Sequence, residues 1–95
     1  MPIGSLTLII LLPVSASLKE KRHQIKPILN RLHKEFNISV AEYAQQDSLH
    51  FSTIRIALVC NDHRKIESQL RIILGFFRSH WPDVQVIDDK IEVLY

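Results

Sequence analysis

The sequence has few of the residues that interrupt or cross-link a chain. Its 95 residues include two glycines, four prolines and one cysteine, which is unlike the composition of disordered segments. A single cysteine, Cys60, excludes an internal disulfide and favours a reducing compartment, so we expect a cytoplasmic protein. The length predicts a single domain, residues 1–95, with one hydrophobic core and room for at most one cofactor-sized site.

Sequence signatures of catalysis and cofactor binding are also missing. There is no phosphate-binding glycine loop, no nucleophile elbow and no dinucleotide fingerprint. The five histidines are scattered, and we interpret Cys60 and His63 as a core cysteine beside a solvated histidine rather than a metal site. We therefore expect no metal, no cofactor and no enzymatic activity. A small phosphate-ester or acyl-phosphate hydrolase is a third-ranked alternative, because Arg22 and Asn61 could approach one another.

The longest uncharged run lies near the N-terminus. Residues 3–12, IGSLTLIILL, are too few to span a bilayer, and Pro13 ends the run. This pattern predicts a buried strand and no association with a membrane. The run also resembles the end of a secretory signal, but no lysine or arginine precedes Lys19, so the charged region typical of such signals is absent.

Two segments have the 3.6-residue periodicity of amphipathic helices. Ser17 and Glu20 form a capping box that predicts a helix over 18–35, kinked at Pro27 or, as a second alternative, broken there. Asn61 or Asp62 is the predicted cap of a second helix. The apolar positions are Leu18, Ile25, Ile28, Leu29, Leu32 and Phe36 in the first helix and Ile66, Leu70, Ile73, Leu74 and Phe77 in the second.

The remaining segments predict the fold. Residues 38–44, 51–60 and 84–95 are typical of strands, with Asp88-Asp89 marking a bulge or a bend in the last. The order of strand, helix, strand, strand, helix, strand predicts an α+β, ferredoxin-like βαββαβ sandwich, with both helices on one face of a four-stranded antiparallel sheet. Within it we expect the first and third strands to be adjacent and parallel, so that both helices begin at the same end of the sheet.

The sheet face opposite the helices is predicted to be apolar. An open face of this kind is either shielded by the terminal strand or covered by a partner, and we expect it to serve as the interface of a possible homodimer. The alternative function is therefore a homo-oligomeric or protein-interaction module. The predicted interface residues are Thr7, Ile9, Leu11, Ala57 and Val59.

The formal net charge of +2 conceals an uneven distribution. The expected shared helix end gathers six cations and two acids, a formal +4, which leaves −2 for the rest of the chain. Free N–H groups at both helix starts would also favour an anion. The alternatives are a merely solvated face and a surface that binds RNA through its phosphates. The predicted anion- or RNA-binding residues are Lys19, Lys21, Arg22, His23, Lys26, His63, Arg64 and Lys65.

Three segments resemble a known family. SLKEKR (17–22), FNISVAE (36–42) and Asn61-Asp62 are similar to the YlxP-like proteins, small bacterial proteins of about this length that form a domain of unknown function. The resemblance covers nearly the whole chain, although Pro27 departs from the family pattern. It implies a ferredoxin-like fold and brings no established catalytic activity. Members' genes often lie near genes of translation and ribosome maturation, which implies an RNA- or ribosome-associated module as the first expectation.

Overall fold

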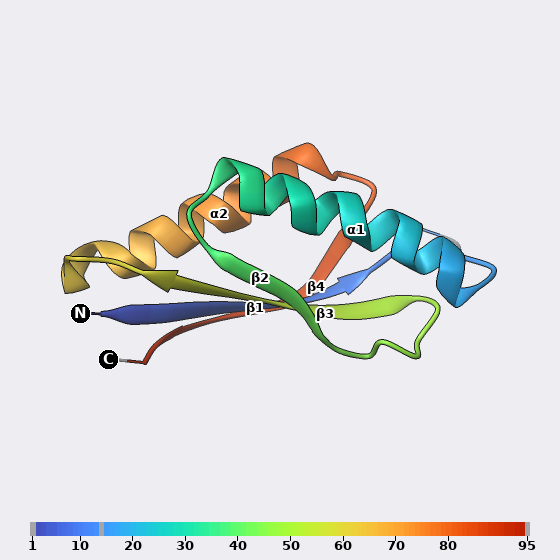
Figure 1. Cartoon of the computed structure of the whole chain (residues 1–95), viewed down its shortest axis with the longest axis horizontal. Coiled ribbons are helices and arrows are strands. Elements are labelled where there is room, and N and C mark those ends of the chain that lie inside the picture. The colour runs from blue at the N-terminus through green and yellow to red at the C-terminus, as the bar shows by residue number, and fades with distance from the viewer. Residues whose placement is uncertain (1, 14, 95) are drawn as a thin grey trace.

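The computed structural model describes residues 2–13 and 15–94 and confirms the predicted α+β class and order of elements. Both helices lie on one side of a four-stranded antiparallel sheet, in the ferredoxin-like arrangement (Figure 1). Tyr95, the end of the predicted last strand, lies outside the described residues. The elements are β1 (Ile3–Leu11), α1 (Leu18–Glu35), β2 (Ser39–Ala44), β3 (Phe51–Val59), the 3-10 turn η1 (His63–Lys65), α2 (Ile66–His80) and β4 (Gln85–Val93).

Helix α1 begins and ends where the sequence predicts. The Ser17 Oγ accepts a hydrogen bond from the Glu20 N–H at 3.2 Å, and the Glu20 carboxylate accepts one from the Ala16 N–H at 2.7 Å. This is a capping box whose returning bond falls one residue earlier than usual. The helix continues without interruption through Pro27, so the alternative of two short helices is wrong.

The pairing of β1 with β3 differs from the prediction. The sheet order is β2-β3-β1-β4, and β3 runs antiparallel to β1, with Ile3 opposite Val59 and Leu11 opposite Phe51. The connections explain this direction. The crossover through α1 makes β2 run the same way as β1, and the β2–β3 hairpin then reverses the chain. Because β3 lies between β1 and β2, it must oppose both.

The two helices consequently begin at opposite ends of the sheet. Helix α1 follows the end of β1 at Leu11, whereas η1 and α2 follow the end of β3 at Val59, which lies beside Ile3 at the start of β1. In Figure 1, α1 starts at the right of the molecule and α2 starts at the left. The molecule measures 43 Å along this axis. The expected shared helix end is therefore wrong.

Alternate strand residues and one stripe of each helix form the core, as the periodicity predicts. The residues at the margin of this stripe, Leu18, Leu29 and Phe36, are half-buried. The predicted core positions found buried are Leu6, Leu8, Ile10 and Leu12 around β1, Ile54, Ile56, Leu58 and Cys60 around β3, Ile25, Ile28 and Leu32 in α1, and Ile66, Leu70, Ile73, Leu74 and Phe77 in α2.

Both edge strands contain a register shift. In β2 the shift leaves Tyr43 as an extra residue between Glu42 and Ala44. In β4 the partners of Ile9 and Ile10 are Asp88 and Val86, so Ile87 is the extra residue. The predicted bulge is confirmed, one residue earlier than Asp88-Asp89. A bulge locally increases strand twist, and the side chains of Tyr43 and Ile87 are both exposed.

Helix α2 approaches the sheet most closely at Gly4. A Cβ atom there would lie 2.9 Å from Cγ1 of Ile66 and 3.0 Å from Cδ1 of Leu70. Both side chains are fully buried, so they have little space into which to move. The missing side chain at Gly4 therefore sets the distance between β1 and the start of α2.

We expect Gly4→Ala to lower the free energy of unfolding by about 1–3 kcal/mol, because the added methyl group overpacks this contact. Urea denaturation followed by circular dichroism measures the change. Gly75→Ala in α2 is the matched control, since a Cβ there meets no atom within 4 Å. It should raise stability by about 0.5–1 kcal/mol through helix propensity. Equal effects of the two substitutions would contradict the close approach at Gly4.

Candidate functional site

The predicted basic patch is divided between the two ends of the molecule. Lys19, Lys21, Arg22, His23 and Lys26 lie on the first turns of α1. In contrast, η1 consists of His63, Arg64 and Lys65 and follows β3 at the opposite end of the sheet. The eight residues therefore do not form one surface. The physical reason is the antiparallel direction of β3, which carries the chain away from the start of α1 before α2 begins.

At the η1 end, Arg64 is engaged by its own helix cap. Its Nε lies 3.3 Å from Oδ1 of Asp62, and the same Oδ1 accepts the Arg64 backbone N–H at 2.9 Å. The Arg64 side chain thereby holds the pKa of the Asp62 carboxyl below its usual range. Asp62 therefore caps the 3-10 turn η1 that leads into α2, whereas Lys65 holds the N-cap position of α2 itself without a side-chain bond. Asp62 also neutralises one of the two full cations of this segment.

Lys21 is not part of any exposed surface. Its side chain is only 2% exposed, and its Nζ lies 3.1 Å from Oε2 of Glu42 and donates a 2.6 Å hydrogen bond to the carbonyl oxygen of Gln45. The same Oε2 accepts a hydrogen bond from the Ser52 hydroxyl at 2.7 Å. The prediction that Lys21 binds an external anion is wrong, because its position within the apolar arc of α1 directs it into the interior.

This cluster anchors the β2–β3 hairpin to the start of α1. Gln45 adopts φ 61°, a left-handed conformation that is uncommon for residues other than glycine. Three bonds hold it there: its main-chain oxygen accepts from Lys21 Nζ and from the Ser48 N–H at 3.1 Å, and the Thr53 hydroxyl donates to its side-chain oxygen at 2.9 Å. The left-handed conformation of Gln45 is therefore stabilised in part by Lys21, which lies on α1.

Four of the predicted residues remain together on the outer face of α1. Lys19, Arg22, His23 and Lys26 are all exposed, and in the described part of the chain none has a carboxylate within 4 Å. We call these four residues the α1 stripe. Arg22, His23 and Lys26 also line a shallow hollow of about 480 Å³, with Pro27 at its side. The stripe is the largest part of the predicted site that the structure preserves.

The backbone amides at the start of α1 are less available than expected. The Glu20 N–H is bonded to Ser17, and the Glu20 carboxylate occupies the approach to the Ala16 N–H. An external anion would compete with this internal carboxylate. Any anion binding at this end consequently depends on the side chains of the α1 stripe, with little help from the helix amides.

The predicted interface residues share the open face of the sheet, as their alternation requires. Thr7, Ile9 and Leu11 are half-buried, whereas Ala57 and Val59 are exposed. Cross-strand pairing places charged residues among them: Arg55 and Lys90 flank Thr7, and Asp88 and Glu92 lie opposite Ile9 and Ser5. The face is therefore less uniformly apolar than β1 alone suggests. The homodimer stays a prediction.

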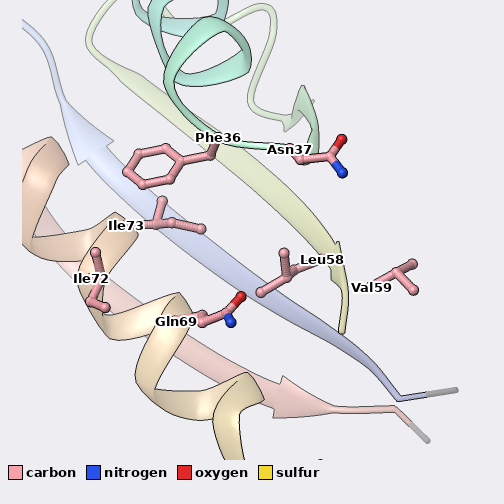
Figure 2. A pocket seen from close by; sticks show the side chains of 7 residues that line it. All are labelled: Phe36, Asn37, Leu58, Val59, Gln69, Ile72 and Ile73. Carbon is pink, nitrogen blue, oxygen red and sulfur yellow. The ribbon is translucent and has the colours of Figure 1, made fainter. Parts of the chain in front are cut away.

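An apolar hollow that the sequence did not predict lies between α2 and the end of β3. It has a volume of about 370 Å³ and is lined by Phe36, Leu58, Val59 and Ile73, with the amides of Asn37 and Gln69 at its rim (Figure 2). Ile72 stands beside it, 63% exposed. Phe76, one helical turn further along α2, packs against Phe36 at 5.1 Å between ring centroids. The lining holds no ionisable side chain, so it favours an apolar contact over catalysis.

The described residues give no support to the catalytic or metal alternatives. Arg22 lies on α1 beyond the end of β1, whereas Asn61 follows β3 at the opposite end of the sheet, so the two cannot form the predicted hydrolase pair. No group of three potential metal ligands occurs within the described ranges, and Cys60 is buried. No helix in those ranges combines the length and apolar character needed to cross a membrane.

We expect Lys21→Met to lower the free energy of unfolding by about 3 kcal/mol, because it removes the only cation paired with the Glu42 carboxylate in the described residues and one of the donors to the Gln45 carbonyl. This is the low end of the range for buried pairs, since Glu42 is 18% exposed. Lys19→Met, two residues away on the exposed side, should change stability by about 0.5 kcal/mol or less. Thermal and urea denaturation measure both. Equal losses would show that the buried pair has no special role.

Comparison with known proteins gives a family but no activity. Residues 3–91 match the family described as "Protein of unknown function (DUF503)". The chain is also 35% identical over 71 residues to the "Uncharacterized protein YlxP" of Bacillus subtilis (strain 168), an alignment that covers 75% of this chain and 76% of the relative. The match agrees with the resemblance carried by residues 17–22 and 36–42. The chain therefore belongs to the DUF503 family, whose function is unknown.

Proposed function

We propose that this protein binds RNA, ribosomal RNA in the first instance, by placing the α1 stripe against the phosphate backbone. The observation that carries the proposal is the set of Lys19, Arg22, His23 and Lys26 on one exposed helix face, without an acidic partner in the described part of the chain. Arginine and lysine in such an arrangement are the usual donors to phosphate oxygens.

The spacing of the stripe supports this use. Positions 19, 22, 23 and 26 follow the i, i+3, i+4, i+7 pattern, so the side chains form one row along about two helical turns. A row of two turns is roughly 11 Å long, which suits two successive phosphates of an extended strand better than a single small anion. The hollow beside Pro27 is lined by Arg22, His23 and Lys26 and gives a phosphate room to approach these side chains.

The expected interaction is electrostatic and reads little sequence. Strand β1 has no aromatic side chain and Phe51 stands at the start of β3, so the base-stacking mode of RNA-recognition motifs is not supported. Three full cations that each release a counterion predict a slope of log K against log salt of about −2 for single-stranded RNA. Affinity should therefore fall steeply as ionic strength rises.

The charge-reversal pair Lys19→Glu and Arg22→Glu should weaken binding to a fluorescently labelled single-stranded RNA by about tenfold or more, and should reduce the salt slope by about 1.4. Fluorescence anisotropy at several salt concentrations measures both quantities. Neither side chain is buried, so the variant should keep its fold, which circular dichroism checks.

The matched control is Arg64→Glu with Lys65→Glu at the opposite end of the molecule. Each pair of substitutions changes the formal net charge by −4, from +2 to −2. The control should therefore reproduce any effect of net charge alone while leaving the salt slope near its original value. If both variants lose the same affinity and slope, the binding is non-specific and the α1 stripe is not the site.

Association with the ribosome is tested in cell lysate. The tagged chain should co-purify with ribosomal RNA at low salt, lose it after RNase treatment and release it at moderate salt. The Lys19→Glu, Arg22→Glu variant should retain little RNA in the same purification. Recovery of equal RNA with this variant would exclude the α1 stripe as the contact.

A further inference from the structure

The open face of the sheet contains a third hollow, separate from the α1 stripe and from the apolar hollow beside α2. It has a volume of about 500 Å³, within the range of small-molecule sites. The hollow exists because small side chains, Ser39, Ala41 and Ala57, surround one long cation, Arg55, on neighbouring strands. It lies on the side of the sheet away from both helices.

Arg55 has no acidic partner in the described ranges of the chain. No carboxylate oxygen lies within 4 Å of its guanidinium. Its Cζ instead lies 5.2 Å from the ring centroid of Tyr43, the extra residue of the β2 bulge. A ring can hold one face of a guanidinium and leave the N–H groups at its edge free for a planar anion. The bulge thus places the Tyr43 ring against the Arg55 guanidinium, which keeps its positive charge unneutralised.

Ser5 supplies the second, independent observation. Its side chain is 1% exposed, and its Oγ is the sole buried side-chain polar atom of the described residues that has no hydrogen-bond partner. Strand alternation directs it to the open face, where Ser5 lines the hollow. A buried hydroxyl without a partner is unfavourable and rare in native proteins. Its persistence at the floor of a hollow points to a ligand atom as the missing partner.

The positions of Arg55 and Ser5 suit a carboxylate. Arg55 pairs with Thr7, and Ser5 pairs with Ala57, so the two residues are diagonal neighbours across β1 and β3. Diagonal neighbours have Cα atoms about 7–8 Å apart, a gap that one carboxylate can bridge with a hydrogen bond to each side. Leu94, which is 47% exposed and follows β4, also lines the hollow and supplies part of its apolar wall.

The acidic side chains near the hollow, Glu42 and Glu92, do not neutralise the Arg55 guanidinium. Glu42 is among the residues that line the hollow, but its carboxylate is held by Lys21 and Ser52 on the helix side of the sheet. Glu92, opposite Ser5, lies 3.8 Å from the Lys90 ammonium. The hollow therefore presents a free guanidinium, hydroxyl donors and an apolar wall. We propose that it binds a small organic carboxylate with an apolar body, through the Arg55 guanidinium and the Ser5 hydroxyl.

Protein-observed NMR titration of the full chain tests the proposal with phenylacetate as the probe. We expect saturable shifts of the Ser5, Arg55 and Ala57 amides with a Kd of about 1 mM. Phenylacetamide, the neutral match, should bind at least about tenfold more weakly. Equal binding of phenylacetamide, equal shifts with inorganic phosphate, or no saturable shift with phenylacetate would each overturn the proposal.

Arg55→Gln should weaken phenylacetate binding by about tenfold or more. Arg71→Gln is the matched control, because Arg71 lies on α2 and pairs with Glu67, and it should bind as the unaltered chain does. The Lys19→Glu, Arg22→Glu variant should also bind phenylacetate normally, which separates this hollow from the α1 stripe. If Arg55→Gln binds as well as Arg71→Gln, the guanidinium does not hold the carboxylate.

Ser5→Ala gives a test that does not depend on Arg55. Removing an unpartnered buried hydroxyl should raise the melting temperature of the ligand-free protein by roughly 4 °C and weaken phenylacetate binding at the same time. A lower melting temperature would mean that the hydroxyl is already satisfied, which would overturn its role. Shifts of the same amides on dilution of ligand-free protein would show that a second copy covers the hollow, which would also overturn the proposal.

Discussion

The direction of β3 is the constraint on which the rest of the structure depends. A hairpin delivers β3 between β1 and β2, so it runs against both, and η1 and α2 then start at the end of the sheet where β1 starts. The neighbour of the α1 N-terminus is therefore the β2–β3 hairpin and not the start of α2. This placement decides which cations meet acids within the fold and which remain facing solvent.

The ion pair between Lys21 and Glu42 is a direct result of that placement. Apolar residues of similar volume would often stabilise such a position as well or better. A charged pair adds a requirement on register, however, because a slip of one residue in β2 would turn Glu42 to the other face of the sheet. The pair thus ties the start of α1 to one specific alignment of the shortest strand, β2.

Much of the fold could be predicted because its determinants are local. Ser17 and Glu20 marked the start of α1, and the 3.6-residue spacing of Ile66, Leu70 and Phe77 identified the buried face of α2. The strand direction was mispredicted although its signal was present: the short turn at residues 45–48 already implied a reversal. Because of this error, three of the eight predicted site residues, His63, Arg64 and Lys65, lie at the other end of the molecule from the rest.

The contacts made by single side chains were less predictable, because they join residues distant in sequence. The position of Lys21 within an apolar arc was visible, but its partners Glu42 and Gln45 became known only with the hairpin in place. Arg55 offered a signal of a different kind, as a lone charge on a strand face of small and apolar residues. The orphaned hydroxyl of Ser5 had no signal, since burial on an open sheet face depends on neighbouring strands.

The two register shifts at the sheet margins have a consequence for association between molecules. An exposed, regular edge strand is a template on which another chain can add a strand and begin to aggregate. Here β2 is only six residues long and has a bulge at Tyr43. Strand β4 has a bulge at Ile87, and the next three residues of the same strand, Asp88 to Lys90, are charged. Neither margin offers a long straight ladder of free amides. The edge strands therefore disfavour edge-to-edge strand pairing between molecules, and any contact between molecules falls on the faces of the sheet.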